Sequence, residues 1–268
     1  MIVAPRLLIA GTCAGLLALA PGGMGSAAQH NEDALPDFSG TWEGPGFDLA
    51  PPENGGPGPV VNASKDIQHP EGDYRNPWLQ PWAAKQVQFW AEESRAGRAP
   101  AHAHALCLPT SVPGVMTLHQ GYQFLQEANR VTILINNQSQ FRHVYLNVPH
   151  SRNVKPSWYG ESVGHYEGGT LVVDTVGIKT MDVVPLDRFG TPHTEKLHVV
   201  ERIRKVNPKE IRVDYHVEDP GVFTAAWDAS LTFHPFKEEW GEDPCSENNI
   251  DVTGKLLPGL PVDEHPAF

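Results

Sequence analysis

Residues 158–175 read W-Y-G-E-S-V-G-H-Y-E-G-G-T-L-V-V-D-T, and this stretch decides the fold. Two runs of alternating apolar and polar residues meet at Gly168-Gly169. Because glycine readily adopts positive φ angles, such a pair is typical of a two-residue hairpin turn. The stretch therefore predicts a β-hairpin with these cross-strand pairs: Glu167 with Thr170, His165 with Val172, and Val163 with Asp174.

Alternation gives this hairpin two different faces. The more apolar face is expected to point into the core, and it carries Trp158, Ser162, Tyr166, Leu171, Val173 and Thr175. The other face carries Tyr159, Glu161, His165 and Asp174. Asp174 lies diagonally opposite His165 and Glu161, at a separation that long side chains can bridge. The polar face is therefore a candidate site, although the solvated face of any antiparallel sheet shows the same pattern.

Two features bear on the choice between a site and an ordinary solvated face. Gly160 and Gly164 occupy strand interiors, where glycine weakens a strand unless something must approach closely, and this favours a site. A one-residue slip would place His165 and Asp174 on opposite faces, so the site depends on the register.

Strand-like runs flank the hairpin on both sides. They cover residues 122–127, 131–136, 140–146, 193–205, 210–218 and 227–234, and Thr41-Trp42 adds a first short strand. Charged residues in the fourth run, Glu201 and Arg202 with Glu195 and Arg204, are expected to form a cross-strand charge ladder. Strands at this spacing predict an all-β fold: an antiparallel lipocalin-like barrel, or a sandwich, of about nine strands.

One helix and one irregular arm precede most of these strands. The helix is expected at about 81–96, with Pro81 at its start and Gly97 after its end. Trp82, Phe89 and Trp90 are expected to form its packing face. Residues 44–77 are rich in Pro and Gly and predict a long irregular N-terminal arm.

The first residues have the pattern of an export signal. Arg6 precedes an apolar run at 7–20, and Ser26-Ala27-Ala28 supplies small residues for cleavage. Residues 1–28 are therefore expected to be a signal peptide, and residues 29–268 a single barrel-like domain without an integral membrane segment. The expected location is periplasmic or secreted.

The net charge limits the classes of binding partner that are expected, and the cysteine content bears on the cellular compartment. Removing Arg6 leaves 19 basic residues against 32 acidic ones and moves the formal charge from -12 to -13. This balance argues against nucleic acid and anionic lipid as partners and leaves neutral or cationic small molecules open. Cys107 and Cys245 remain after cleavage, and a disulfide between them is the simplest expectation for an exported chain.

Three segments carry a resemblance to known families. Gly40-Thr41-Trp42 resembles the G-x-W that starts the first strand of lipocalins and related calycin barrels. With residues 158–175 and the run H-T-E-K-L-H-V-V-E-R-I-R at 193–204, the chain resembles an uncharacterised family of exported bacterial proteins. The resemblance implies a barrel and export. It implies no activity, and no catalytic residue is carried over from it.

The leading functional hypothesis is an exported small-molecule enzyme that needs no cofactor. The sequence contains no nucleophile elbow, phosphate-binding loop, dinucleotide fingerprint or H-E-x-x-H motif. We expect His165, oriented by Asp174, to act as general base, with Tyr159 or Glu161 as acid or oxyanion donor. Such a set fits a lyase, isomerase or hydrolase. The expected ligand contacts are Trp158, Tyr145 and His143.

Two alternatives remain open. His143, Tyr145 and His165 could join His193, His198 or His216 in a metal-dependent hydrolase, and His102 and His104 could also hold a metal. A lipocalin-like carrier of a small apolar or aromatic ligand is the other alternative. The lining of the cavity distinguishes them: an apolar pocket favours carriage, whereas His165 and Asp174 buried together favour catalysis.

Overall fold

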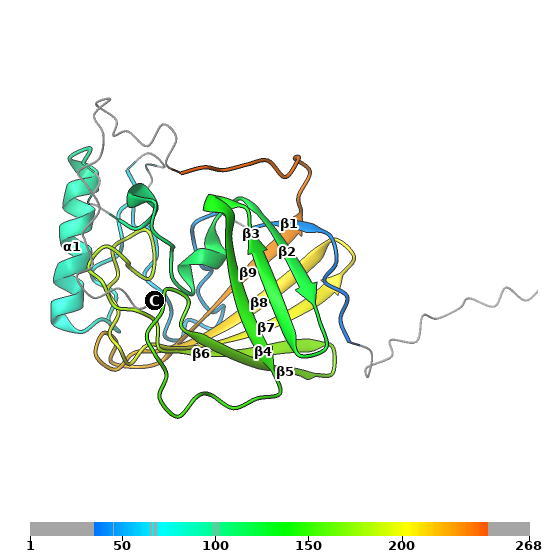
Figure 1. Cartoon of the computed structure of the whole chain (residues 1–268). Helices are drawn as coiled ribbons and strands as arrows, with labels where there is room; N and C mark the ends of the chain where they lie inside the picture. Colours follow the sequence, from blue (N-terminus) through cyan, green and yellow to red (C-terminus); the bar gives the residue numbers. More distant parts are fainter. Residues whose placement is uncertain are drawn as a thin grey trace, which may run out of the picture. The chain divides into compact units, whose positions relative to one another are not determined.

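The computed structural model describes residues 35–245, apart from residues 45, 65, 67, 68, 99 and 101. The expected signal peptide at 1–28, the start of the mature chain at Gln29 and the tail after residue 245 lie outside the described residues. The described part folds into a closed barrel of nine strands with one α-helix beside it (Figure 1). The predicted all-β barrel is therefore confirmed.

The strands follow one another around the barrel in chain order. They are β1 (Thr41–Glu43), β2 (Gly121–Gln126), β3 (Arg130–Ile135), β4 (Gln140–Leu146), β5 (Glu161–Glu167), β6 (Thr170–Val176), β7 (His198–Asn207), β8 (Glu210–Glu218) and β9 (Trp227–Pro235), and β1 pairs with β9 to close the barrel. One pair departs from the expected antiparallel pattern, because β4 and β5 run parallel. Residues 147–160 form the longer crossover that a parallel connection requires.

The β5–β6 hairpin has the predicted register. Glu167 pairs with Thr170, His165 with Val172, and Val163 with Asp174. On the inner face Ser162, Leu171, Val173 and Thr175 are buried, and Tyr166 is half-buried. Trp158 does not continue this inner row, because Gly160 has a φ of +66° and turns the chain before β5 begins. The indole of Trp158 instead lies 5.2 Å from Lys179 Nζ.

Side chains fill the interior of the barrel. Tyr122 and Phe233 meet with ring centroids 4.9 Å apart, and Ile133, Ile203 and Ile211 are fully buried around them. Glu201 also points inward, and it forms an ion pair with Arg142 of β4 in which both side chains are fully buried. The expected cross-strand charge ladder was therefore wrong for Glu201, because it shares the inward face of β7 with Val199 and Ile203.

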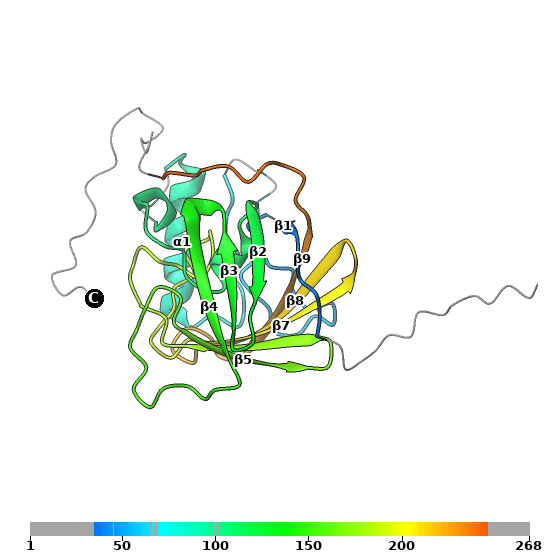
Figure 2. The same ribbon diagram turned by 45° about the vertical axis from the view of Figure 1, so that its right-hand side comes forward.

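Helix α1 (Pro81–Arg95) lies beside the barrel, away from the turns of the β5–β6 and β7–β8 hairpins (Figures 1 and 2). Its buried face consists of Ala83, Val87, Trp90 and Ala91. The expected packing face was wrong for Trp82 and Phe89, which are about half exposed. The residues that follow them, Ala83 and Trp90, face the domain instead. Val87 packs closely against Gly72, where a Cβ atom would lie 2.8 Å from its side chain.

One disulfide and two hydrogen bonds hold the end of the described chain. Cys107 and Cys245 form the predicted disulfide, 138 residues apart in sequence. Before it, the Asn136 side chain donates to Gly241 O at 2.7 Å, and the Gln138 backbone donates to Asp243 Oδ2 at 2.9 Å. The disulfide fits an oxidising compartment. Within residues 35–245, no described helix is long and apolar enough to cross a membrane.

Candidate functional site

The predicted His165–Asp174 pair lies on one outer face of the hairpin, but the two side chains have other partners. His165 Nε2 lies 2.9 Å from Glu167 Oε1, two residues along the same strand. Asp174 Oδ1 lies 3.0 Å from both His150 Nε2 and His198 Nε2. Both partners approach Asp174 from neighbouring segments, whereas His165 is two cross-strand pairs nearer the turn. The described contacts therefore contain no His165–Asp174 hydrogen bond.

Asp174 belongs to a row of alternating carboxylates and imidazoles across the outside of β5 to β9. In order, the row contains Glu161, His150, Asp174, His198, Glu218, His216 and Asp228. Burial opposes ionisation of Glu161, but hydrogen bonds from Ser151 and His150 outweigh it and lower its pKa. The hydrogen bond to Asp228 raises the pKa of His216. These side chains are a quarter to two-thirds exposed, so water competes for every contact.

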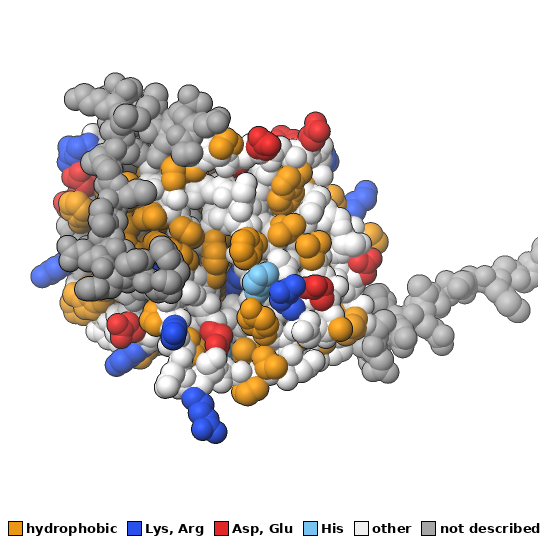
Figure 3. Space-filling model, in the orientation of Figure 1, with side chains coloured by type: hydrophobic (Ala, Val, Ile, Leu, Met, Phe, Trp, Pro, Cys, Tyr) orange, Lys and Arg blue, Asp and Glu red, His pale blue; other side chains and the backbone are white. Residues whose placement is uncertain are grey.

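Four of the predicted site residues do line one shallow groove. It has a volume of about 500 Å³ on the outside of β4 and the 147–160 connection, and its walls include His143, Tyr145, Tyr159 and Glu161. Tyr159 donates to Gln140 Oε1, and burial raises its pKa although the nearby Arg142 opposes this. On this side of the molecule, hydrophobic side chains lie among charged ones over β2, β3 and β4 (Figure 3). Trp158, His165 and Asp174 do not line this groove.

The histidines of the metal hypothesis do not converge on one site, although His198 and His216 both contact Glu218. His143 Nδ1 contacts Thr132 Oγ1 at 3.0 Å, His198 contacts Asp174, and His216 contacts Asp228. His193 is buried, and this burial lowers its pKa. The side chain of His104 lies outside the described residues. Among the residues that are described, no three His, Cys, Asp or Glu side chains are placed to hold a metal ion.

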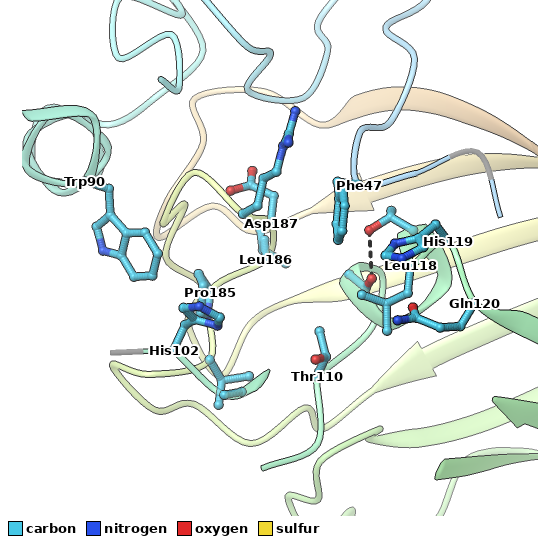
Figure 4. A pocket seen from close by; sticks show the side chains of 15 residues that line it. Phe47, Trp90, His102, Thr110, Leu118, His119, Gln120, Pro185, Leu186 and Asp187 are labelled. Atoms are coloured by element: carbon cyan, nitrogen blue, oxygen red, sulfur yellow. Dashed lines mark hydrogen bonds between the residues drawn. The ribbon is translucent and has the colours of Figure 1, made fainter. Parts of the chain in front are cut away.

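A more enclosed pocket lies elsewhere, between α1 and the loops beside the barrel. Its volume is about 350 Å³. Its walls come from the N-terminal arm, α1, residues 102–120 and residues 184–188, and they include Phe47, Trp90, His102, Thr110, Leu118, His119, Gln120, Leu186, Asp187 and Arg188. Figure 4 shows Phe47 and His119 on one side of the pocket, and Trp90 and His102 on the other.

Aromatic side chains fix the shape of this pocket. Phe47 packs edge-on against His119, with ring centroids 5.0 Å apart. Across the pocket, Trp90 rests on the backbone of Gly190, so closely that a Cβ atom there would lie 2.1 Å from the indole. Gly190 has a φ of +76°, which also favours glycine. The helix and the 184–191 segment are therefore held together at the pocket wall.

Asp187 is the most unusual polar group of the pocket. Its Oδ1 accepts hydrogen bonds from the backbone of Phe189 at 2.9 Å and Thr191 at 3.2 Å. Its Oδ2 accepts none from the described residues. Burial raises the pKa of Asp187 to about 6, and the nearby charge of Asp48 adds to the rise; the Thr191 side chain and the backbone of Thr191 and Phe189 oppose it. A carboxyl group with such a pKa in an apolar cleft is typical of a functional site.

Two other polar atoms of the pocket wall also have unused hydrogen-bonding capacity. Thr110 Oγ1 and Gln120 Oε1 are buried and have no hydrogen-bond partner among the described residues. Both residues line the pocket. Buried polar atoms are normally paired, so unpaired ones on a cavity wall indicate where a ligand can bind.

Sequence patterns could not identify this pocket. Asp187 stands in an irregular segment without strand or helix periodicity, and Phe47, Trp90 and Gln120 come from distant parts of the chain. The clearest sequence signal is the run of apolar residues around Asp187, from Val183 to Phe189. No family model, curated protein or solved structure matches the chain.

Proposed function

We propose that this chain is an exported binding protein, periplasmic or secreted, that holds a small apolar or aromatic molecule in the pocket beside the barrel. The observation that carries the proposal is the pocket itself: its volume is about 350 Å³, and its exposed wall is mostly apolar, with contributions from Phe47, Trp90 and Leu186. Small-molecule sites are typically such concave, largely apolar cavities with a few convergent polar atoms. The filled barrel interior supports a site beside the barrel in place of a lipocalin-like cup.

The surroundings of His165 and Asp174 favour ligand binding over catalysis by these two residues on the hairpin. The side chain of His165 is 51% exposed and that of Asp174 is 41% exposed. Water screens groups at such exposure, and the two side chains form hydrogen bonds with other partners, so their surroundings do not favour a catalytic dyad.

Acid–base catalysis in the pocket is the second candidate function. The pKa of Asp187, about 6, and its unpartnered Oδ2 favour it. A carboxyl group in these surroundings exchanges a proton with a bound substrate near neutral pH, as a lyase, isomerase or hydrolase requires.

Tryptophan fluorescence and calorimetry test the binding proposal, with 1-naphthalenemethanol as an apolar probe. Thr110→Trp fills the pocket without removing packing, and Trp90→Ala deletes one wall. Both variants are expected to weaken binding about tenfold or more. The matched control is Trp82→Ala on the same helix, because Trp82 is exposed and lies outside the pocket. Unchanged affinity in Thr110→Trp and Trp90→Ala would reject the pocket as the binding site.

Turnover separates the two candidate functions. If the pocket is catalytic, Asp187→Asn is expected to abolish conversion of a substrate while binding persists. A ligand that is recovered unchanged after prolonged incubation with the wild-type chain supports carriage.

A further inference from the structure

Resting on the proposed binding function, we propose that the natural ligand of this pocket is an organic cation, with an apolar ring-sized body and a protonated amine that pairs with Asp187. Neutral and anionic ligands of the same size would bind less well. The inference assigns a ligand class and a polar anchor to the pocket.

The free oxygen of Asp187 is the first support. Oδ1 is held by the backbone of Phe189 and Thr191, which fixes the carboxyl group. Among the described residues, none donates to Oδ2 and no Lys, Arg or His forms an ion pair with Asp187. A carboxylate in apolar surroundings is unfavourable unless it is paired, so the pocket gains most from a ligand that brings a positive charge.

The cation nearest in sequence is already neutralised. Arg188 donates to Asp48 through both Nε, at 2.8 Å, and Nη2, at 2.7 Å. This bidentate geometry is the strongest that a carboxylate and a guanidinium form. Asp48 also contributes to the raised pKa of Asp187, so the two carboxylates interact. One negative charge at the pocket is therefore left without a cation when Asp187 is ionised.

The walls suit a cation with an apolar body. Trp90 offers an aromatic surface, and such surfaces attract cations through their quadrupoles. The ring of Phe47 already has the Arg188 guanidinium 5.6 Å from its centroid, so Phe47 supplies apolar contact. Thr110 Oγ1 and Gln120 Oε1 supply unpaired acceptors that an ammonium group can use. The formal charge of -12 for the whole chain also attracts cations and repels anions over longer distances.

Three probes that share one ring system test the inference: 1-naphthylmethylamine, 1-naphthalenemethanol and 1-naphthoate. Calorimetry at pH 7.5 with the full exported chain is expected to show the amine binding about tenfold or more tightly than the alcohol, and the acid most weakly. The preference for the amine is expected to disappear in Asp187→Asn, which keeps the Oδ1 acceptor. It is also expected to fall as the pH decreases through 6, because Asp187 becomes protonated.

The matched control is Asp182→Asn. Asp182 is exposed and precedes the pocket segment by two residues, so its loss changes the net charge equally without touching the pocket. This variant is expected to retain the preference for the amine. A general charge effect would weaken amine binding equally in both variants and would overturn the inference.

The outcomes separate this inference from the proposed function. If the alcohol binds as well as the amine and Thr110→Trp blocks both, the pocket is supported as the binding site and the preference for a cationic ligand is rejected. Tighter binding of the acid also rejects the cation. If none of the three probes binds at millimolar concentration, both the binding function and its ligand class are rejected.

Discussion

Arg142 on β4 and Glu201 on β7 form an ion pair across the closed interior of the barrel, and both side chains are fully buried. Arg142 Nη1 donates to Glu201 Oε1 at 3.0 Å, and its other nitrogens donate to Ser162 and Thr175. Four strands of the barrel are therefore connected by one guanidinium group. Since the surrounding side chains exclude water, neither charge can be hydrated if its partner is removed.

Arg142→Met is expected to destabilise the fold by about 3 to 5 kcal/mol, because it leaves Glu201 buried without a counter-charge. The double variant Arg142→Met, Glu201→Leu is expected to recover much of this loss, since apolar replacement of a whole buried pair is often tolerated. Urea unfolding at pH 7 measures both. A double variant no more stable than Arg142→Met alone would contradict this expectation.

Gly190→Ala is expected to disturb the pocket and the helix together. The new Cβ atom would lie 2.1 Å from the Trp90 ring, at a backbone φ of +76° that alanine rarely adopts. We expect a loss of stability of about 2 kcal/mol or more and weaker ligand binding. Thermal unfolding and calorimetry measure these effects. The matched control is Gly169→Ala in the hairpin turn, where a Cβ would meet no atom within 4 Å.

Asp187→Asn is expected to stabilise the ligand-free protein in a pH-dependent way. The native pKa is raised from 3.8 to about 6, so the native state holds the proton more tightly than the unfolded chain. The stability due to this proton is complete below pH 3.8 and is lost as the pH rises through 6. Asparagine carries no charge at any of these pH values. The free energy of unfolding of the variant is therefore expected to exceed that of the wild type by about 1 to 3 kcal/mol at pH 8, and to differ little at pH 4. Urea unfolding at both pH values checks it, and an equal gain at both would contradict the assignment.

His216 is expected to titrate above its usual range. Its Nδ1 lies 2.8 Å from Asp228 Oδ1, and this contact raises its pKa. The protonated imidazole therefore stabilises the folded state below the ordinary histidine pKa, and this contribution is lost as the pH rises through the native value. NMR titration of the imidazole measures the pKa. Asp228→Asn is expected to lower it, and an unchanged pKa would show that the contact does not persist in solution.

The sequence by itself determined the elements of the barrel. Alternation is a property of neighbouring residues, so it identified Gln140–Leu146 and Glu210–Glu218 with the observed bounds. The two glycines at 168 and 169 fixed the hairpin register, because their backbone freedom selects one tight turn. The same alternation, followed along β7, places Glu201 on the inward face with Val199 and Ile203. Because nearby residues in this run are also charged, Glu201 was assigned to a charge ladder instead.

Only the tertiary structure decided which polar groups meet. Register put His165 and Asp174 on one face, but His150 and His198 reach Asp174 from other segments and take its hydrogen bonds. The pocket depends on contacts between distant segments: Phe47 from the arm, Trp90 from α1 and Asp187 from a loop. Local patterns record which face of a strand or helix a residue occupies. They do not show which distant segment packs against that face. The raised pKa of Asp187 comes from its burial by such distant segments, so no local pattern could predict it.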